Sequence, residues 1–192
     1  SGKRTYQDFY NEVTSIANYL LSSGIRKGDK IAILSANMPN WGITQFAIAR
    51  IGAIAVPVLP GFSSIEIQNI LEHSESKIIF VSKLLYKLVA DIKTSYLEQK
   101  ILMNTFARIP EEYPVEAIDK LENNIGLNNL TPLPAIQVEE EDTASIIYTS
   151  GTTGFSKGVE LTHRNLVWNA RQCATIQPVS IQDRLLSILP LA

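Results

Sequence analysis

The chain has 192 residues, 45% of them hydrophobic, and 17 basic against 19 acidic side chains leave a net charge of -2. This composition supports a buried core and excludes a disordered chain. A nucleic-acid-binding protein would usually carry a basic excess, so that class is disfavoured. The single Cys173 excludes an intrachain disulfide framework and fits a reducing compartment. We expect its thiol to be buried in a helix.

Strands and helices are expected to alternate along the first 103 residues. Apolar spacing and end signals predict helices over 6–20 (N-cap Thr5, stop at Gly24), from Pro39 to Gly52, after a cap at Ser63 or Ser64, and from Leu84 to about Tyr96. Short apolar runs predict buried strands over 29–35, 53–59, 77–81 and 101–103. This rhythm predicts an α/β fold, doubly wound, with mainly parallel sheet layers and flanking helices.

The pattern weakens between Asn104 and Asp142, where prolines and asparagines predict loops and one short helix at most. A boundary near residue 136 would separate an N-terminal α/β portion, 1–136, from a second segment of the same domain, 137–192. The acidic run at 139–142 could face a metal or a basic partner, but we favour a solvated lead-in to the next strand. A helix capped by Thr162 and a strand over 183–191 are expected to follow.

Lys83, Lys87 and Lys93 lie along the helix predicted from Leu84. A basic amphipathic helix can lie on an anionic membrane. We favour a helix that covers the sheet, because a parallel crossover needs one at this place. No apolar run approaches the roughly 20 residues that cross a bilayer. The sequence therefore predicts a cytoplasmic protein, with peripheral association at the inner membrane face left open.

A loop rich in small residues follows the apolar run 144–148. It contains hydroxyl and glycine residues and then a lysine: Thr149, Ser150, Gly151, Thr152, Thr153, Gly154 and Lys157. Glycines let the backbone approach phosphate oxygens and turn its N–H groups inward. The hydroxyls can donate hydrogen bonds, and the lysine supplies a compact positive charge. The loop is therefore a candidate phosphate-binding site.

The spacing differs from the P-loop of kinases and GTPases, which reads G-x-x-x-x-G-K-[ST] and opens a helix. Here Ser156 precedes Lys157, Gly158 follows it, and residues 158–162 alternate with the period of a strand. We therefore predict a strand–loop–strand unit in which backbone N–H groups, hydroxyls and lysine bind phosphate without a helix dipole. A phosphotransferase of the kinase type is disfavoured.

Residues 148–154, with Lys157-Gly158-Val159 and Leu161-Thr162-His163, closely resemble the signature loop of the adenylate-forming (AMP-binding) enzymes. Many members of that family have proline where this chain has Ser156, which loosens the loop without removing a phosphate ligand. Three earlier segments, 24–33, 37–41 and 52–58, are also similar to the family's opening region, and we interpret them as architecture. Thr162-His163-Arg164-Asn165 and the Leu-Pro-Leu ending look most like bacterial long-chain acyl-CoA synthetases.

The resemblance implies an acid–thiol ligase that uses ATP, Mg²⁺ and coenzyme A. A carboxylate attacks the α-phosphorus of ATP, pyrophosphate leaves, and a thiol then takes the acyl group from the acyl-adenylate. By this resemblance Thr149 to Gly154 would hold the β- and γ-phosphates, and Lys157, the candidate catalytic residue, would offset charge on the leaving group. The partners implied are small molecules, namely a fatty acid, ATP and coenzyme A. The adenine, ribose and C-terminal lysine sites of the family are not found in this sequence, so we expect an N-terminal part that is inactive alone.

Alternatives remain at several points. The substrate could instead be an aryl or medium-chain acid, or the acyl group could be loaded onto a carrier protein by a fatty-acyl-AMP ligase. From a different class, the chain could be a non-catalytic nucleotide-binding or interaction module.

His73, His163 and Cys173 show no metal-ligand spacing, which disfavours a zinc site. Ser150 lacks the G-x-S-x-G setting of a nucleophile, and we expect His163 to mark a helix start rather than to act in catalysis.

Overall fold

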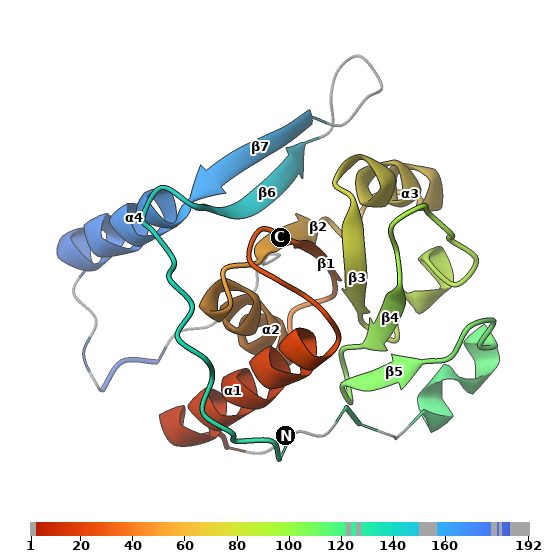
Figure 1. The fold of residues 1–192 in the computed structure, drawn as a ribbon, viewed down its shortest axis with the longest axis horizontal. Helices are drawn as coiled ribbons and strands as arrows, with labels where there is room; N and C mark the ends of the chain where they lie inside the picture. The colour runs from red at the N-terminus through yellow and green to blue at the C-terminus, as the bar shows by residue number, and fades with distance from the viewer. Residues whose placement is uncertain are drawn as a thin grey trace.

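The computed structural model describes residues 3–121, 124–125, 128–149, 157–177, 180 and 182–184. Within these residues the strands form one seven-stranded sheet in the order β5-β4-β3-β1-β2-β6-β7 (Figure 1). The strands are β1 (Lys30–Leu34), β2 (Ile54–Val58), β3 (Ser76–Val81), β4 (Gln99–Leu102), β5 (Ala107–Ile109), β6 (Thr143–Thr149) and β7 (Lys157–Thr162). β4, β3, β1, β2 and β6 run parallel, and the edge strands β5 and β7 are antiparallel to their neighbours.

Helices cover both faces of this sheet. α1 (Tyr6–Ser22) and α2 (Pro39–Arg50) pack on one face, and α3 (Ser64–His73) packs on the other with two 3₁₀ turns, η1 (Tyr86–Leu88) and η2 (Val115–Lys120). Successive residues of a strand point to opposite faces, so Ile31 and Ile33 of β1 join the α1–α2 core while Ala32 and Leu34 join the α3 core. The predicted doubly wound, mainly parallel α/β fold is confirmed.

The predicted helix ends are formed by local hydrogen bonds. Thr5 and Ser63 each accept a hydrogen bond from the backbone N–H three residues on, and the carboxylates of Asp8 and Glu66 bond back to the cap residues. These reciprocal capping boxes satisfy N–H groups that the first helical turn leaves free. The same hydrogen bonds hold the pKa values of both carboxyl groups below their usual range. At the other end of α1, Gly24 follows the helix with a φ of +89°, a conformation that glycine adopts at little cost.

The prediction of a helix from Leu84 to about Tyr96 is wrong. This segment contains the short turn η1 and irregular backbone. Its buried residues Tyr86, Val89 and Ile92 recur every third position, which suits tight 3₁₀ turns better than an α-helix. They pack into the α3 core, so the segment does cover the sheet. Among the described residues, no helix is long and apolar enough to span a bilayer.

Residues 104–142 also contain one strand that the sequence did not predict. β5 has three residues and pairs with β4 at the sheet edge, and η2 is the short helix that was expected. The extended chain after residue 128 then runs along α1 (Figure 1), where the Asn18 amide donates to the carbonyls of Asn129 (3.1 Å) and Thr131 (2.8 Å). The division of the chain near residue 136 stays a prediction.

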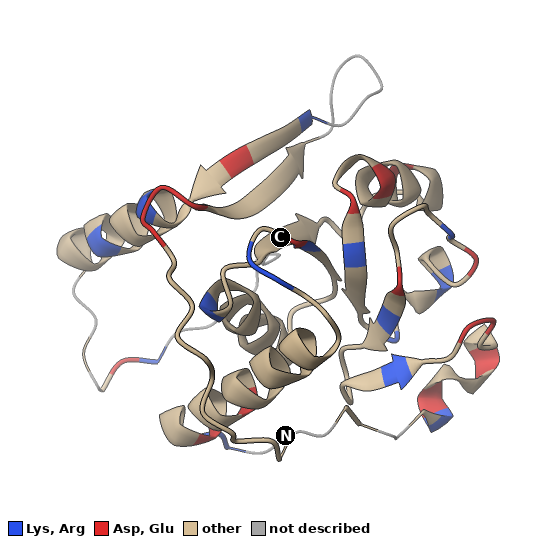
Figure 2. Ribbon diagram, in the orientation of Figure 1, with Lys and Arg blue, Asp and Glu red and all other residues tan. Residues whose placement is uncertain are grey.

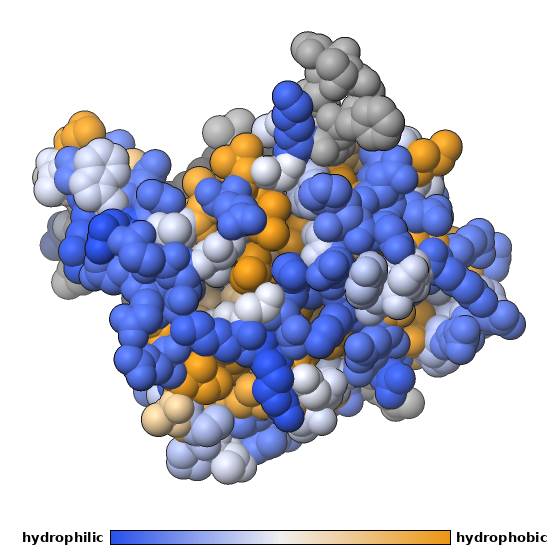
Figure 3. All heavy atoms as spheres, turned by 45° about the horizontal axis from the view of Figure 1, so that its top comes forward, coloured by the Kyte–Doolittle hydropathy of each residue, from blue (hydrophilic) through white to orange (hydrophobic). Residues whose placement is uncertain are grey.

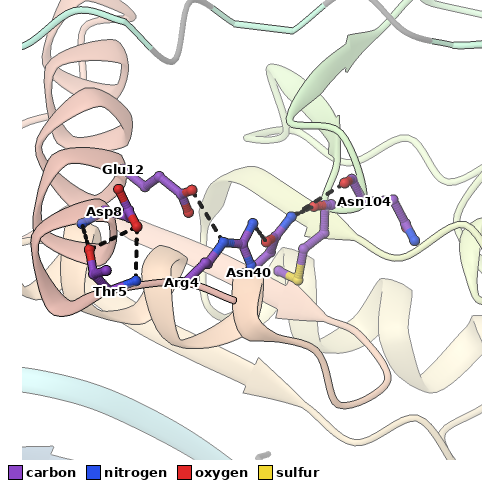
Figure 4. A network of polar contacts seen from close by, with 7 residues as sticks. Arg4, Thr5, Asp8, Glu12, Asn40 and Asn104 are labelled. Atoms are coloured by element: carbon purple, nitrogen blue, oxygen red, sulfur yellow. Dashed lines mark hydrogen bonds and ion pairs between the residues drawn. The ribbon is translucent and has the colours of Figure 1, made fainter. Parts of the chain in front are cut away.

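A polar network, buried only around Asn40, joins the starts of α1 and α2 to the loop after β4 (Figure 4). The Asn40 amide donates to the carbonyl of Met103 at 2.7 Å and to that of Asn104 at 3.3 Å. Arg4 in turn donates to Asn40 Oδ1 at 3.0 Å and pairs with Glu12 at 3.2 Å. Asn40 is only 8% exposed, so the segment 37–41 has the structural role expected of it.

Candidate phosphate-binding site

The predicted strand–loop–strand unit is present. β6 and β7 form an antiparallel ribbon whose last pair before the loop is Thr149 with Lys157 (Figure 1). Both side chains are exposed. The remaining predicted phosphate ligands, Ser150, Gly151, Thr152, Thr153 and Gly154, lie outside the described residues. The structure therefore brings together the two residues that flank the loop, one hydroxyl and one ammonium group.

The flanking pair lies at the edge of the sheet where ligands bind in open α/β folds. β6 is parallel to β2, β1, β3 and β4, so Thr149 points to the same edge as the carboxyl ends of those strands. Bound molecules occupy crevices beyond this edge because the connecting loops diverge there. Thr149 and Lys157 therefore lie where a ligand-binding loop of such a fold would begin and end, and the phosphate-binding role of the residues between them stays a prediction.

Lys157 is free to meet an anion. Within the described residues it forms no ion pair. Lys157 is the first residue of β7 and Glu160 lies farther along the strand, and Figure 2 shows one basic and one acidic segment on β7. Glu160 is bonded instead to the Thr143 hydroxyl at 3.2 Å, at the end of the ribbon away from the loop.

Among the described residues, the helix that follows the loop begins only after β7. α4 (His163–Ile176) starts at the far end of β7, where Thr162 accepts a hydrogen bond from the Asn165 N–H and the Asn165 side chain bonds back to Thr162. The N-terminus of α4 is therefore separated from the loop by the whole length of β7. The predicted N-cap is confirmed, and the site differs from a P-loop, in which a helix N-terminus faces the phosphates.

Tyr148, next to Thr149, packs under the last turn of α3. Its side chain is 2% exposed, and its hydroxyl lies 2.7 Å from Nδ1 of His73, the last residue of α3. The two rings meet edge to face, with centroids 5.8 Å apart. Burial raises the pKa of the Tyr148 phenol. Sequence reasoning did not find His73, because no local pattern links residues 75 positions apart.

Gly158 lies directly opposite Tyr148 in the ribbon. A Cβ atom at this position would lie 2.9 Å from Cγ2 of Ile146 and 3.2 Å from Cζ of Tyr148. Carbon atoms pack at about 3.5–4.0 Å, so a larger residue would push the strands apart. The glycine after Lys157 is therefore required by the close approach of β7 to the Tyr148 ring.

The acidic run 139–142 is exposed for most of its length, as predicted, and also forms ion pairs. Asp142 pairs with Lys27 at 2.6 Å, and Arg164 of α4 pairs with Glu140 at 3.2 Å and with Glu141. The hydrogen bond from Lys27 and one from the backbone N–H of Glu139 lower the pKa of Asp142. These contacts tie the start of β6 to α1–β1 and to α4. Among the described residues no cluster of carboxylate, imidazole and thiolate groups could hold a metal ion.

Two predictions concern α4. His163 is its first residue, as expected, and its backbone N–H donates to the Asp142 carbonyl at 3.1 Å. The prediction that Cys173 is buried is wrong, because its side chain is exposed. None of the residues of α4 is buried, and the apolar residues Leu166, Val167 and Trp168 are also exposed.

Figure 3 shows apolar side chains (orange) that reach the surface at several places on the face it presents.

Comparison with known proteins identifies the family. The family model described as "AMP-binding enzyme" matches residues 1–192. The chain belongs to the AMP-binding enzymes. The crotonobetaine/carnitine–CoA ligase of Citrobacter koseri is 34% identical over 193 residues, covering 97% of this chain and 36% of that protein. The long-chain-fatty-acid–CoA ligase FadD15 of Mycobacterium bovis is 31% identical over 188 residues, covering 95% and 30%.

The fold agrees with that assignment. A fatty acyl CoA synthetase structure from Mycobacterium tuberculosis superposes with a TM-score of 0.78 at 25% identity, covering 99% of this chain and 35% of that chain. The chain spans about a third of the length of these AMP-binding relatives. Its sheet and helices match the N-terminal domain of acyl-CoA synthetase structures.

Proposed function

We propose that the natural full-length protein is an ATP-dependent acid–thiol ligase that activates a long-chain fatty acid as acyl-AMP and transfers it to coenzyme A. The observation that carries this proposal is the Thr149–Lys157 pair, which flanks the family's signature loop at the carboxyl edge of the parallel sheet. The family match over the whole chain supports the adenylation step. The FadD15 relative supports a long-chain acid.

The first step requires negative charge to be stabilised, both on the reacting groups and on the leaving group. A carboxylate oxygen must approach the α-phosphorus of ATP, the bond to the bridging oxygen breaks, and pyrophosphate leaves with additional negative charge. Lys157, exposed and without an ionic partner among the described residues, would offset that charge. The hydroxyl of Thr149 would donate a hydrogen bond to a phosphate oxygen beside it. Such preorganised donors lower the barrier because they need no reorientation as charge develops.

Mg²⁺ would enter this site as the counter-ion of ATP. The residues described on either side of the loop offer one hydroxyl and one ammonium group. Neither group is a carboxylate, which is the ligand that a resident Mg²⁺ prefers. A Mg·ATP complex already carries its metal on the phosphates. In the second step the thiol of coenzyme A would attack the acyl carbonyl carbon, and AMP would leave.

A second candidate substrate follows from the relative with 34% identity, whose name specifies crotonobetaine and carnitine. These acids are short and carry a quaternary ammonium group, so they need a very different acyl pocket from a long chain. Acid-dependent ATP–pyrophosphate exchange, measured over carboxylates from acetate to oleate with carnitine, crotonobetaine and an aryl acid, separates the candidates.

We expect exchange to be fastest with the long-chain acids. A maximum with carnitine, crotonobetaine, a medium-chain or an aryl acid would retain the adenylating activity and replace the substrate. Equal adenylation but acyl transfer to a carrier protein instead of coenzyme A would identify a fatty-acyl-AMP ligase. A folded protein without exchange for any acid would contradict the proposal and favour a non-catalytic nucleotide-binding module.

A further inference from the structure

β6 lies beside β2, but the ladder pairing between these two strands is confined to a position away from the loop. β2 and β6 share one ladder pair, Ala55 with Ser145, and the Ser145 hydroxyl donates to the Ala55 carbonyl at 3.0 Å. Ser145 is in the amino-terminal half of β6, whereas the loop leaves from Thr149. Figure 1 shows β6 and β7 as a two-stranded ribbon beside β2 at one side of the sheet. Backbone pairing with β2 therefore does not fix the end of β6 that carries the site.

The loop end of β6 is attached by a side chain. Tyr148 inserts beneath α3, and its hydroxyl meets Nδ1 of His73 at 2.7 Å. α3 is itself held rigidly, since Ile67, Ile70 and Leu71 are buried in the core between helix and sheet. The hydrogen bond therefore connects a fixed helix to the residue immediately before Thr149.

This contact can form in each protonation state of the imidazole. With its proton on Nε2, His73 accepts a hydrogen bond at Nδ1 from the Tyr148 hydroxyl. With a proton on Nδ1, in the neutral or the cationic ring, it donates to the tyrosine oxygen. The edge-to-face packing of the two rings, at an interplanar angle of 88°, adds a preferred orientation. His73 thus restricts both the position and the rotation of the Tyr148 side chain.

The ribbon transmits this restriction to Lys157. Tyr148 pairs with Gly158, and its ring fills the space that a side chain on Gly158 would occupy. Thr149 pairs with Lys157 one step closer to the loop. A displacement of Tyr148 would therefore move both residues that flank the loop, and groups at such a site must be placed to within about 0.5 Å to act on a ligand.

We propose that His73 is a positioning residue of the phosphate site: it holds Tyr148, and through Tyr148 it sets the placement of Thr149 and Lys157. The role rests on the proposed adenylating function, because it acts on the site for the ATP phosphates. His73 itself does not touch the nucleotide in this account. Loss of the contact weakens the productive binding of ATP and leaves the binding of the acid unchanged.

Kinetics of the natural full-length protein provide the first test. We expect His73→Ala and Tyr148→Phe each to raise the KM for ATP about three- to tenfold in the exchange assay, with the KM for the acid unchanged. The double variant should have a KM for ATP no higher than that of the more severe single variant, because both substitutions remove the same contact. His73→Asn should restore a KM within about twofold of the wild type, since its amide can reach the position of Nδ1.

Asn69→Ala is the matched control. Asn69 lies on α3 one turn before His73 and is exposed, so this variant tests the effect of an alanine in the same helix without loss of the contact. It should leave both KM values unchanged. Equal KM values for His73→Ala and Asn69→Ala, or additive effects in the double variant, would overturn the proposal.

Amide hydrogen exchange provides a readout that does not depend on activity. His73→Ala and Tyr148→Phe should accelerate exchange in peptides that cover β6 and β7, while peptides from β1 and β3 exchange as in the wild type. Acceleration spread evenly over the whole sheet would mean general destabilisation and would overturn the positioning role. If the wild type showed no acid-dependent ATP–pyrophosphate exchange, the proposed function would fail, and hydrogen exchange would still decide whether His73 holds the ribbon.

Discussion

Replacing Gly158 with alanine tests the packing that places β7 against β6. The added methyl carbon would lie 2.9 Å from Cγ2 of Ile146 and 3.2 Å from Cζ of Tyr148. The φ of Gly158 is not positive, so alanine can adopt this backbone conformation. Strain would therefore come from crowding alone. Overpacking of this kind costs about 1–3 kcal/mol, which would lower both the Tm and the urea midpoint.

Thermal and urea unfolding of the natural full-length protein would measure the effect. Gly61→Ala is the control, because a methyl carbon added there would have no heavy atom from beyond the adjacent residues within 4 Å, and the φ of Gly61 is not positive. That variant should be neutral or more stable by up to about 1 kcal/mol, since alanine restricts the unfolded chain. Equal stabilities of Gly158→Ala and Gly61→Ala would refute the packing argument.

A second measurement locates the strain. Ile146→Ala removes Cγ2, the atom nearest to the new methyl group, so it should offset part of the cost of Gly158→Ala. The double variant is then expected to be more stable than the sum of the two single effects by about 0.5–3 kcal/mol, the range found for residues in contact. Strict additivity would mean that the two positions do not touch. Because β7 is an edge strand, it is also expected to relax outward and to displace Lys157.

Three further predictions concern the framework. Asn40→Ala should lower the free energy of unfolding by about 1–3 kcal/mol in urea titration, because the buried Met103 carbonyl loses a donor; an unchanged midpoint would contradict this. Thr162→Ala should cost about 1 kcal/mol and reduce helicity measured by circular dichroism, since α4 loses its cap. The lowered pKa values of Asp8 and Glu66 mean that their stabilisation is fully present above the ordinary carboxyl pKa and is lost as the pH falls through the folded-state values. The double variant Asp8→Asn, Glu66→Gln should therefore show a weaker loss of stability on acidification, and an unchanged pH profile would refute the assignment.

The alternating framework could be predicted from the sequence because each element has a local signal. β1 and β2 are short apolar runs buried on both faces, and α1 and α3 begin with complete capping boxes. Local signals of this kind do not depend on distant contacts. The strand–loop–strand form of the site was also predictable, since the residues after Lys157 alternate with the period of a strand.

Other features depend on contacts that a local pattern does not encode. β5 has three residues and forms only by pairing with β4. The segment 84–96 has enough apolar residues for a helix, but the buried positions follow a three-residue spacing. Cys173 occupies an apolar position of an amphipathic helix, which predicts burial only if another element packs on that helix. The contact of His73 with Tyr148 joins two elements that are distant in the sequence.

In the proposed function, the β6–β7 ribbon presents Lys157 to the phosphates of ATP. The most direct test of this role is acid-dependent ATP–pyrophosphate exchange by the natural full-length protein carrying Lys157→Ala, compared with Lys87→Ala. Lys87 is an exposed lysine of η1 and lies outside the ribbon. We expect the Lys157 variant to lose about 10-fold or more of the exchange rate, because charge on the leaving pyrophosphate is no longer offset, while the Lys87 variant matches the wild type. Equal rates for the two variants would contradict the account.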